Sequence, residues 1–259
     1  MAKTTNSLIM KQSCKVLVLI VLSYQATCKP SSQSDDFKYQ QMQQQMLVQI
    51  KQDTRVTHIA TGISELSPKV IKAMTDVKRH LFVPEQFDEY SYHNRPLPIG
   101  SGQTISQPFI VALMTELLAI ENHHKVLEVG TGSGYQAAIL AKFSDRVFSI
   151  EIIEELGVSA AKRLKSLEYN NVKVKVADGY KGWPDEAPFD AIIVTAAALE
   201  IPPPLIAQLK AGGRMVIPVG GQNQVQQLKL VAKDDTGKVT IKDILAVRFV
   251  PLTGERKVD

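Results

Sequence analysis

The sequence predicts one α/β domain built on a doubly wound, mostly parallel β-sheet with an antiparallel C-terminal edge. Between residues 125 and 220, short apolar segments alternate with amphipathic helical segments. This alternation is typical of parallel strands that are covered by helices on both faces of the sheet. Two longer strand-like segments then follow without a helix between them, which favours antiparallel pairing at one edge. The chain has 259 residues, 44% of them hydrophobic, which is enough for a full core.

Two helices are expected ahead of the sheet, over residues 37–52 and 67–84. Ser67 is expected to cap the second helix, and Pro68 suits its first turn. Residues 29–36 are polar and are expected to form a linker. Both helices have apolar residues at helical spacing on one face, namely Tyr39, Met42, Met46 and Ile50 in the first and Val70, Met74 and Val77 in the second.

A segment with few core residues precedes the third helix. Residues 100–107 are small and polar apart from one isoleucine, and they are expected to form a loop. The helix after this loop is expected to begin at Pro108, and Phe109, Leu113 and Leu117 follow at a spacing of four.

The alternating part of the chain is expected to form seven strands and three more helices. The strands are expected over residues 125–130, 146–151, 172–179, 189–198, 214–220, 225–235 and 239–252. The helices are expected over residues 133–144, 155–168 and 202–213, the last of them ending at two glycines. A turn around Thr236 and Gly237 is expected to join the last two strands.

The net charge of +4 does not by itself indicate a nucleic-acid partner. Four lysines and no acidic residues lie in the first 30 residues, and the rest of the chain has 26 basic and 26 acidic residues. A body without net charge has no general attraction for a polyanion. Cys14 and Cys28 both lie in the same N-terminal segment, so the body contains neither an internal disulfide nor a thiolate metal site. The five histidines show no metal-ligand spacing, and no metal site is predicted.

Residues 1–35 are interpreted as a leader and linker, and residues 36–259 as the functional domain. The leader has basic residues before an apolar run from Val16 to Leu22, as a targeting segment does. That run is far shorter than the ~20 residues that a membrane-spanning helix needs. Two interpretations stay open: an export signal, whose true start could be Met10, or an extension that is not cleaved.

The glycines that follow the first predicted strand indicate a ligand-binding turn. Gly130, Gly132 and Gly134 form a G-x-G-x-G pattern, and Tyr135 occupies the next position. A dinucleotide-binding turn has G-x-G-x-x-G, and a nucleoside-triphosphate loop ends in lysine and a hydroxyl residue. The sequence matches neither pattern. Glycines at this place let the backbone bend sharply and approach a ligand closely.

Acidic residues follow two further predicted strands. Glu151 ends the second strand at about the separation at which an acid reaches ribose hydroxyls in such a unit, and Asp178 with Gly179 ends the third. Asp178 is expected to accept a hydrogen bond from an adenine amino group. A carboxylate at Glu151 attracts a cation and repels a phosphorylated ribose. These strand ends favour S-adenosyl-L-methionine, a nucleoside with a sulfonium charge and no phosphate.

The chain resembles the bacterial type of protein-L-isoaspartate O-methyltransferase from about Gln40 to Leu252. The resemblance rests on residues 95–118, with the family-specific segment "GQTISQP", and on residues 126–141, 189–220 and 246–252. It implies the class I methyltransferase fold and methyl transfer from S-adenosyl-L-methionine to the α-carboxyl group of L-isoaspartyl residues. Such residues arise in ageing proteins, and the ester formed can cyclise to a succinimide and reopen as aspartate.

The resemblance also implies roles for individual residues. Ser106 corresponds to the catalytic serine, and Thr195 and Val250 correspond to positions near the substrate. The positions implied for the cofactor are Thr104, Ile105, Gln107, Gly130, Thr131, Gly132, Gly134, Glu151, Asp178 and Gly179. A cytoplasmic monomer that acts on damaged proteins or peptides is expected, with periplasmic or exported location as the alternative if residues 10–28 act as a signal peptide.

The chemistry explains why no general base or metal is needed. A carboxyl group with a pKa of about 4 is already ionised at neutral pH, so it is a nucleophile without assistance. The hydroxyls of Thr104 and Ser106 can then donate to it and hold it in place. Two alternatives remain at this point: a methyltransferase for another carboxylate, and a non-catalytic protein that binds damaged chains. A nicotinamide-dependent oxidoreductase is disfavoured by Tyr135 in the glycine turn.

Overall fold

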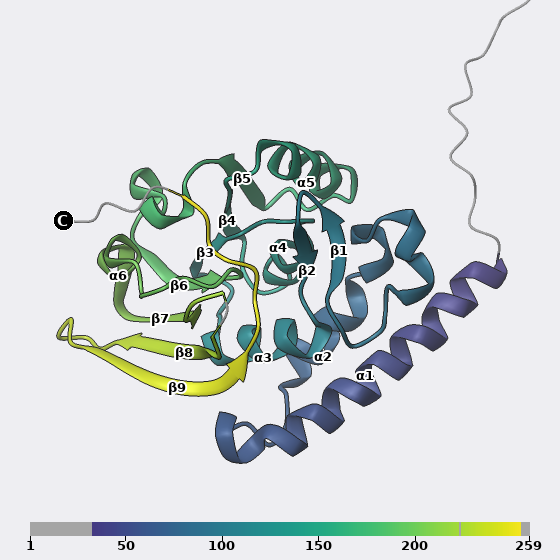
Figure 1. Cartoon of the computed structure of the whole chain (residues 1–259), viewed down its shortest axis with the longest axis horizontal. Coiled ribbons are helices and arrows are strands. Elements are labelled where there is room, and N and C mark those ends of the chain that lie inside the picture. The colour runs from purple at the N-terminus through teal and green to yellow at the C-terminus, as the bar shows by residue number, and fades with distance from the viewer. Residues whose placement is uncertain (1–32, 223, 255–259) are drawn as a thin grey trace, which may run out of the picture.

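A seven-stranded sheet forms the centre of the computed structural model, which describes residues 33–222 and 224–254 (Figure 1). The strand order is β5-β4-β3-β6-β7-β8-β9, with parallel pairing from β5 to β7 and antiparallel pairing of β8 and β9. The strands are β3 Lys125–Val129, β4 Arg146–Glu151, β5 Val172–Val176, β6 Phe189–Val194, β7 Leu209–Val219, β8 Gln226–Lys233 and β9 Val239–Val247. The predicted α/β class, with its antiparallel edge, is therefore confirmed.

Helices cover both faces of the sheet, but unequally. One face carries α1 Gln33–Thr61, α2 Pro68–Asp76, α3 Pro108–Leu118, α4 Tyr135–Leu140 and α5 Glu154–Ser166. In the described part of the chain, the other face carries the short helices η3 Gly179–Lys181, η4 Pro184–Glu186 and α6 Pro203–Gln208. Alternate residues of a strand contribute to the two cores, so Val126 packs on the first face and Leu127 on the second.

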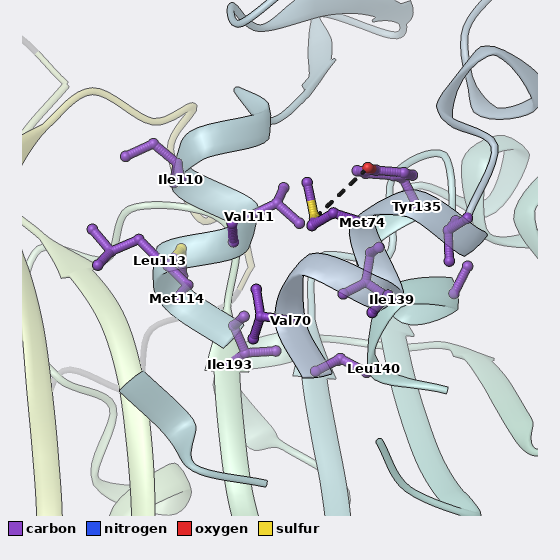
Figure 2. Close-up of a cluster of buried hydrophobic side chains, with 14 of the residues drawn as sticks. Val70, Met74, Ile110, Val111, Leu113, Met114, Tyr135, Ile139, Leu140 and Ile193 are labelled. Carbon is purple, nitrogen blue, oxygen red and sulfur yellow. Dashed lines mark hydrogen bonds between the residues drawn. The ribbon is translucent and has the colours of Figure 1, made fainter. Parts of the chain in front are cut away.

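The first core lies under the N-terminal helices. Figure 2 shows side chains of α2, α3 and α4 meeting above Ile193 of β6. Met46 and Ile50 of α1 are buried in the same core, as their helical spacing predicts. The side chain of Ser67 accepts a hydrogen bond from the backbone N–H of Val70, so the predicted N-cap of α2 is confirmed.

The two N-terminal helices differ in extent from the prediction. Helix α1 runs from Gln33 to Thr61, so it begins inside the segment expected to be a linker and ends nine residues later than expected. Helix α2 ends at Asp76, and the 3₁₀ helices η1 Arg79–Phe82 and η2 Glu85–Tyr90 follow it.

Among the described residues, no helix combines the length and the apolar character that crossing a membrane requires.

The segment expected to be a loop before α3 is mostly a β-hairpin. Strands β1 Leu97–Gly100 and β2 Gln103–Ile105 pair in antiparallel fashion. The turn between them has positive φ at Gly100, Ser101 and Gly102. Two of these three positions are glycine, which adopts positive φ at little cost, so the hairpin depends on the small residues that made the segment look unstructured.

The boundary between α6 and β7 also differs from the prediction. Helix α6 ends at Gln208, and β7 already begins at Leu209, so Gly212 and Gly213 lie inside a strand instead of ending a helix. The pairing of β6 with β7 is irregular there, because its register shifts between Phe189 and Ala191 of β6. Glycine within a strand often accompanies such an irregularity.

Candidate active site

The site lies where the order of the parallel strands reverses, between β3 and β6. From β3 the chain proceeds outward through β4 and β5, and it then returns to place β6 on the other side of β3. The loops after the carboxyl ends of β3 and β6 diverge at this point and leave a crevice, which is the usual ligand site of such a sheet. The sequence-based expectation that the ligand lies across the tips of adjacent strands fits this topology.

The glycine turn after β3 is held against β6. The hydroxyl of Thr195 donates to the carbonyl of Gly130 at 2.6 Å, and the backbone N–H of Thr195 donates to the carbonyl of Val129 at 2.9 Å. Gly130 has a φ of +98°, and a Cβ atom there would lie 2.4 Å from the Thr195 hydroxyl. Only glycine therefore fits at position 130, because both its backbone angle and its neighbour exclude a side chain.

Glu151 links the end of β4 to the glycine turn. Its carboxylate accepts hydrogen bonds from the backbone N–H of Gly132 at 2.8 Å and of Ile153 at 3.0 Å. The side chain is buried, with an exposed fraction of 6%. Each carboxylate oxygen has a second lone pair, so the group can still accept hydrogen bonds from two ligand hydroxyls.

The hairpin β1–β2 lies over the glycine turn. A Cβ atom on Gly132 would lie 3.2 Å from the Ile99 side chain, which shows how closely β1 approaches the turn. Thr104 and Ser106 follow on the same hairpin and line the cleft beside Gly130 and Gly132. Two hydroxyl donors therefore reach the cleft from the side opposite to the strand tips.

A C-terminal strap, residues 250–253, closes another side of the cleft. The backbone N–H of Ala197 donates to the carbonyl of Val250, and the N–H of Leu252 donates to the carbonyl of Ala197, both at 2.8 Å. In Figure 1 the yellow segment after β9 crosses the tips of the central strands. Val250 and the three residues that follow it line the cleft.

The cleft consists of two adjoining parts that share Thr104, Gly130, Gly132 and Thr195. In the part of the chain that the structure describes, neither part is lined by a lysine, an arginine or a histidine, and Glu151 is the only acid. This donor set does not suit a phosphate, which needs basic side chains or a free phosphate-binding loop. It suits an adenosine compound that carries a positive charge and no phosphate, so the residues fit S-adenosyl-L-methionine.

Most of the sequence-predicted residues meet at this cleft. Those that line it are Thr104, Ile105, Ser106, Gly130, Thr131, Gly132, Glu151, Gly179, Thr195 and Val250. Gln107 lines a different surface hollow beside α1, and Gly134 is the N-terminal cap residue of α4, packed against Leu164 and Ala160. The Asp178 carboxylate accepts a hydrogen bond from the backbone N–H of Tyr180 at 2.9 Å and is not among the lining residues. The roles expected for these three remain predictions.

The sequence reasoning missed several lining residues. Gln103 precedes Thr104 on the hairpin, and Ile152 and Ile153 follow Glu151. The apolar pair after Glu151 was the accessible signal, because an isoleucine that directly follows a strand-end acid has to lie at the same edge of the sheet. Apolar side chains there suit contact with a purine ring.

A buried carboxyl group lies beneath the glycine turn. Glu128 of β3 is fully buried and accepts a hydrogen bond from the Ser149 hydroxyl, which is in turn 2.5 Å from the Thr131 hydroxyl. Burial raises the pKa of Glu128 from its usual value of 4.5 to about 8, the Ser149 hydrogen bond opposes this rise, and the charge of Glu151 adds to it. The group is therefore largely protonated at neutral pH.

Three possible metal ligands gather at the far end of β3. Ligand atoms of Glu121, His123 and His124 lie within 4.8 Å of one another, although their sequence spacing did not indicate a site. The Nδ1 atom of His124 accepts a hydrogen bond from the backbone N–H of Glu121 at 3.1 Å. This group precedes the first residue of β3, whereas the cleft follows the last one, so it takes no part in the candidate active site.

Comparison with known proteins places the chain in one family. The family model for protein-L-isoaspartate(D-aspartate) O-methyltransferase matches residues 41–257. A protein-L-isoaspartate O-methyltransferase from Syntrophobacter fumaroxidans is 54% identical over 244 residues, which are 94% of this chain and 98% of the relative. One from a Polaromonas species is 58% identical over 211 residues, which are 82% of this chain and the whole of the relative.

Solved structures agree with these matches. A protein-L-isoaspartate O-methyltransferase structure superposes with a TM-score of 0.71 at 27% identity and covers 82% of this chain and 66% of its own. A second structure, from Plasmodium falciparum and titled as a putative member of the same family, contains S-adenosyl-L-homocysteine. It superposes with a TM-score of 0.64 at 26% identity and covers 72% of this chain and 91% of its own. The chain therefore belongs to the protein-L-isoaspartate O-methyltransferase family.

Proposed function

We propose that this protein transfers a methyl group from S-adenosyl-L-methionine to the α-carboxyl group of L-isoaspartyl residues in damaged proteins and peptides. The single observation that carries the proposal is the cleft, where hydroxyl donors of the hairpin face a strand-end carboxylate with no basic side chain in the described lining. Family membership supports the same reaction. The product ester can cyclise and reopen as ordinary aspartate, which repairs the chain.

The cofactor is held by the strand tips in this proposal. Glu151 accepts hydrogen bonds from the ribose hydroxyls, and the backbone of Gly130 and Gly132 allows the methionine part to approach closely. Ile152 and Ile153 provide apolar surface for the purine. When bound, S-adenosyl-L-methionine supplies a methyl group from its sulfonium sulfur. A carboxylate oxygen can accept this methyl group without any proton transfer.

The hairpin orients the substrate. Ser106 and Thr104 donate hydroxyl hydrogen bonds to the substrate carboxylate, which hold it in line without neutralising its charge. Thr195 is already committed to the carbonyl of Gly130, so its contribution is to fix the turn that faces the substrate. Holding both reactants in line and excluding water can lower the barrier by ~7–11 kcal/mol, which explains how the site works without a base.

A peptide methylation assay tests the proposal. Two peptides that differ only in having isoaspartate or aspartate at one position are incubated with the protein and methyl-labelled cofactor. We expect base-labile ester on the isoaspartyl peptide alone. Equal labelling of both peptides would indicate a methyltransferase for another carboxylate, and binding of both ligands without ester would indicate a non-catalytic binder. Either result would overturn the proposal.

We propose a cytoplasmic location and a monomeric state, on the family resemblance alone. The location is open to test, because an export signal in the leader would place the protein outside the cytoplasm. The match to the Syntrophobacter relative covers 244 residues, which is more than the chain contains from Gln33 onward. The match therefore includes part of the leader, so this segment is shared with at least one relative.

A further inference from the structure

Arg79 is a fully buried cation that touches the proposed catalytic residue from behind. It is the first residue of η1, and its exposed fraction is 0%. Its Nη2 atom donates to the carbonyl of Ser106 and its Nε atom donates to the carbonyl of Ser91, both at 2.8 Å. The Arg79 side chain therefore links Ser106, the residue after β2, to Ser91, the residue after η2.

The charge of Arg79 has no ion-pair partner among the described residues. The guanidinium lies over the Tyr135 ring, 4.9 Å from its centroid, and its Nη1 atom has no hydrogen-bond partner within the described chain. Burial lowers the pKa of Arg79 to about 10, so the group still carries its charge at neutral pH. Buried charges are rare unless they are paired, because removing an ion from water is costly.

Two of the three residues that contact Arg79 form part of the wall of the cleft. Ser106 and Tyr135 line the part of the cleft beneath the hairpin. Figure 2 shows Tyr135 at the edge of the first core, with its hydroxyl directed at the sulfur of Met74. Arg79 thus lies behind two residues of the cleft wall, and a positive charge behind that wall attracts an anion placed in the cleft.

We propose that Arg79 is a positioning residue for the substrate carboxylate: it fixes Ser106 through its backbone carbonyl and supplies the buried positive charge that the anionic substrate group meets. This inference rests on the proposed function, in which the α-carboxylate lies against Ser106. It also explains how a cleft without a basic side chain in its described lining attracts an anion. The positive charge stays behind the wall, where it cannot form a direct ion pair with the carboxylate and reduce its nucleophilicity.

The test compares variants that separate charge from packing. Arg79→Met keeps the length and removes both donors and the charge, whereas Arg79→Lys keeps the charge. The control is Gln43→Met, since buried Gln43 also donates to a backbone carbonyl, that of Thr75 at 2.8 Å, but does not line the cleft. Free energies of unfolding are measured for all variants, so that loss of stability is known for each.

The decisive readout is binding of two peptides, measured by calorimetry with S-adenosyl-L-homocysteine present. One peptide has isoaspartate with a free α-carboxylate, and the other has the α-carboxamide in its place. We expect Arg79→Met to weaken binding of the carboxylate peptide by about tenfold more than binding of the carboxamide peptide. The reason is that only the first peptide has a negative charge at the α-carboxyl position. Arg79→Lys should recover most of this difference, and Gln43→Met should affect both peptides equally.

Equal weakening of both peptides by Arg79→Met would show that the arginine only supports the fold, and the inference would be wrong. If Arg79→Met does not fold, the same comparison on Arg79→Lys and Arg79→Gln decides, because Gln keeps a donor and loses the charge. Failure of the proposed function is seen separately: the wild-type protein would then form no ester on the isoaspartyl peptide, whatever the variants do.

Discussion

At the scale of single residues, the proposed site depends on a few polar atoms held by backbone contacts. Ser106 and Glu151 stand on opposite sides of the cleft, one on the hairpin and one at the tip of β4. Glu128 lies below them without touching the cleft in the described structure. Their different surroundings let each be tested by a different measurement.

Replacing Ser106 with alanine removes the hydroxyl that is proposed to donate to the reacting carboxylate. We expect kcat to fall by at least about tenfold, while cofactor affinity changes little, because a donor aimed at the reacting group acts mainly on turnover. Ser101→Ala is the control, since that exposed hydroxyl at the hairpin tip makes only a 3.4 Å contact with Glu155. Steady-state kinetics with unchanged turnover in Ser106→Ala would contradict its assignment.

Replacing Glu151 with alanine removes the carboxylate that is proposed to accept hydrogen bonds from the ribose hydroxyls. We expect the affinity for S-adenosyl-L-methionine to weaken by ~1–3 kcal/mol, the scale for hydrogen bonds to a charged group. Part of the loss comes from the turn, because the same carboxylate holds the N–H of Gly132. Glu151→Gln keeps one acceptor oxygen, so its affinity for S-adenosyl-L-methionine should lie between those of the wild type and Glu151→Ala. Calorimetry that finds equal affinity for all three proteins would refute the placement.

Glu128 makes the stability of the protein depend on pH. Its pKa is about 8 in the folded protein and near 4.5 when unfolded, so the folded state holds a proton that the unfolded state has lost between these values. The stability that this group contributes is therefore full below pH 4.5 and declines as pH rises towards 8. We expect Glu128→Gln to gain stability relative to wild type over this window, by about 1–3 kcal/mol at pH 8. Denaturant unfolding that shows a difference independent of pH would contradict this.

At the scale of elements, the hairpin β1–β2 and the strap 250–253 enclose a cleft that the sheet alone leaves open. The hairpin forms its own two-stranded sheet, and its Leu97 and Ile105 side chains are buried in the first core. Two-stranded hairpins are marginal by themselves, so this one depends on its turn and on packing over the glycine turn. The glycines at its tip are therefore expected to matter for function.

Gly102 tests the hairpin as a unit. It has a φ of +70°, and a Cβ atom there would meet nothing within 4 Å, so valine would cost only backbone strain. Gly237, at the β8–β9 turn, has a φ of +86° and equally open surroundings, which makes Gly237→Val a matched control. We expect each variant to lose about 1–2 kcal/mol of stability, and only Gly102→Val to raise KM for the isoaspartyl peptide. An unchanged KM in Gly102→Val would show that the hairpin geometry does not govern substrate binding.

At the scale of the whole molecule, the unequal covering of the sheet places the functional segments. The long helices and the hairpin lie on or above one face, and the strap returns to the strand tips from the antiparallel edge. The cleft is therefore built from segments of the N-terminal half, the central sheet and the C-terminus, so removal of either terminal part should abolish binding.

The N-terminal segment, residues 1–35, is the feature on which the proposed location depends. If it is an export signal, the native protein should be found outside the cytoplasm, with a new N-terminus after the apolar run. Intact-mass measurement of the protein isolated from its source, in separate cell fractions, checks this. A mass that corresponds to a chain starting at Met1, found in the cytoplasmic fraction, would support the cytoplasmic proposal and exclude cleavage.

Local patterns in the sequence were sufficient to predict the sheet, the glycine turn and the strand-end carboxylate. These features are local: strand and helix periods are read within a few residues, and parallel strands bring their carboxyl ends to one edge. The positions of Gly130, Gly132 and Glu151 therefore followed from pattern alone. The "GQTISQP" segment added the family, and with it the serine proposed to be catalytic, because a specific motif carries more information than a periodicity.

The distant segments that complete the site could be identified only from the folded structure. Residues 100–107 have the composition of a loop, and their pairing as a hairpin depends on packing over the glycine turn. The contact of Arg79 with Ser106 joins residues 27 positions apart, and the pairing of Ala197 with the strap joins residues more than 50 apart. No local pattern encodes such contacts, because their free energy comes from burial that exists only once the whole chain has folded.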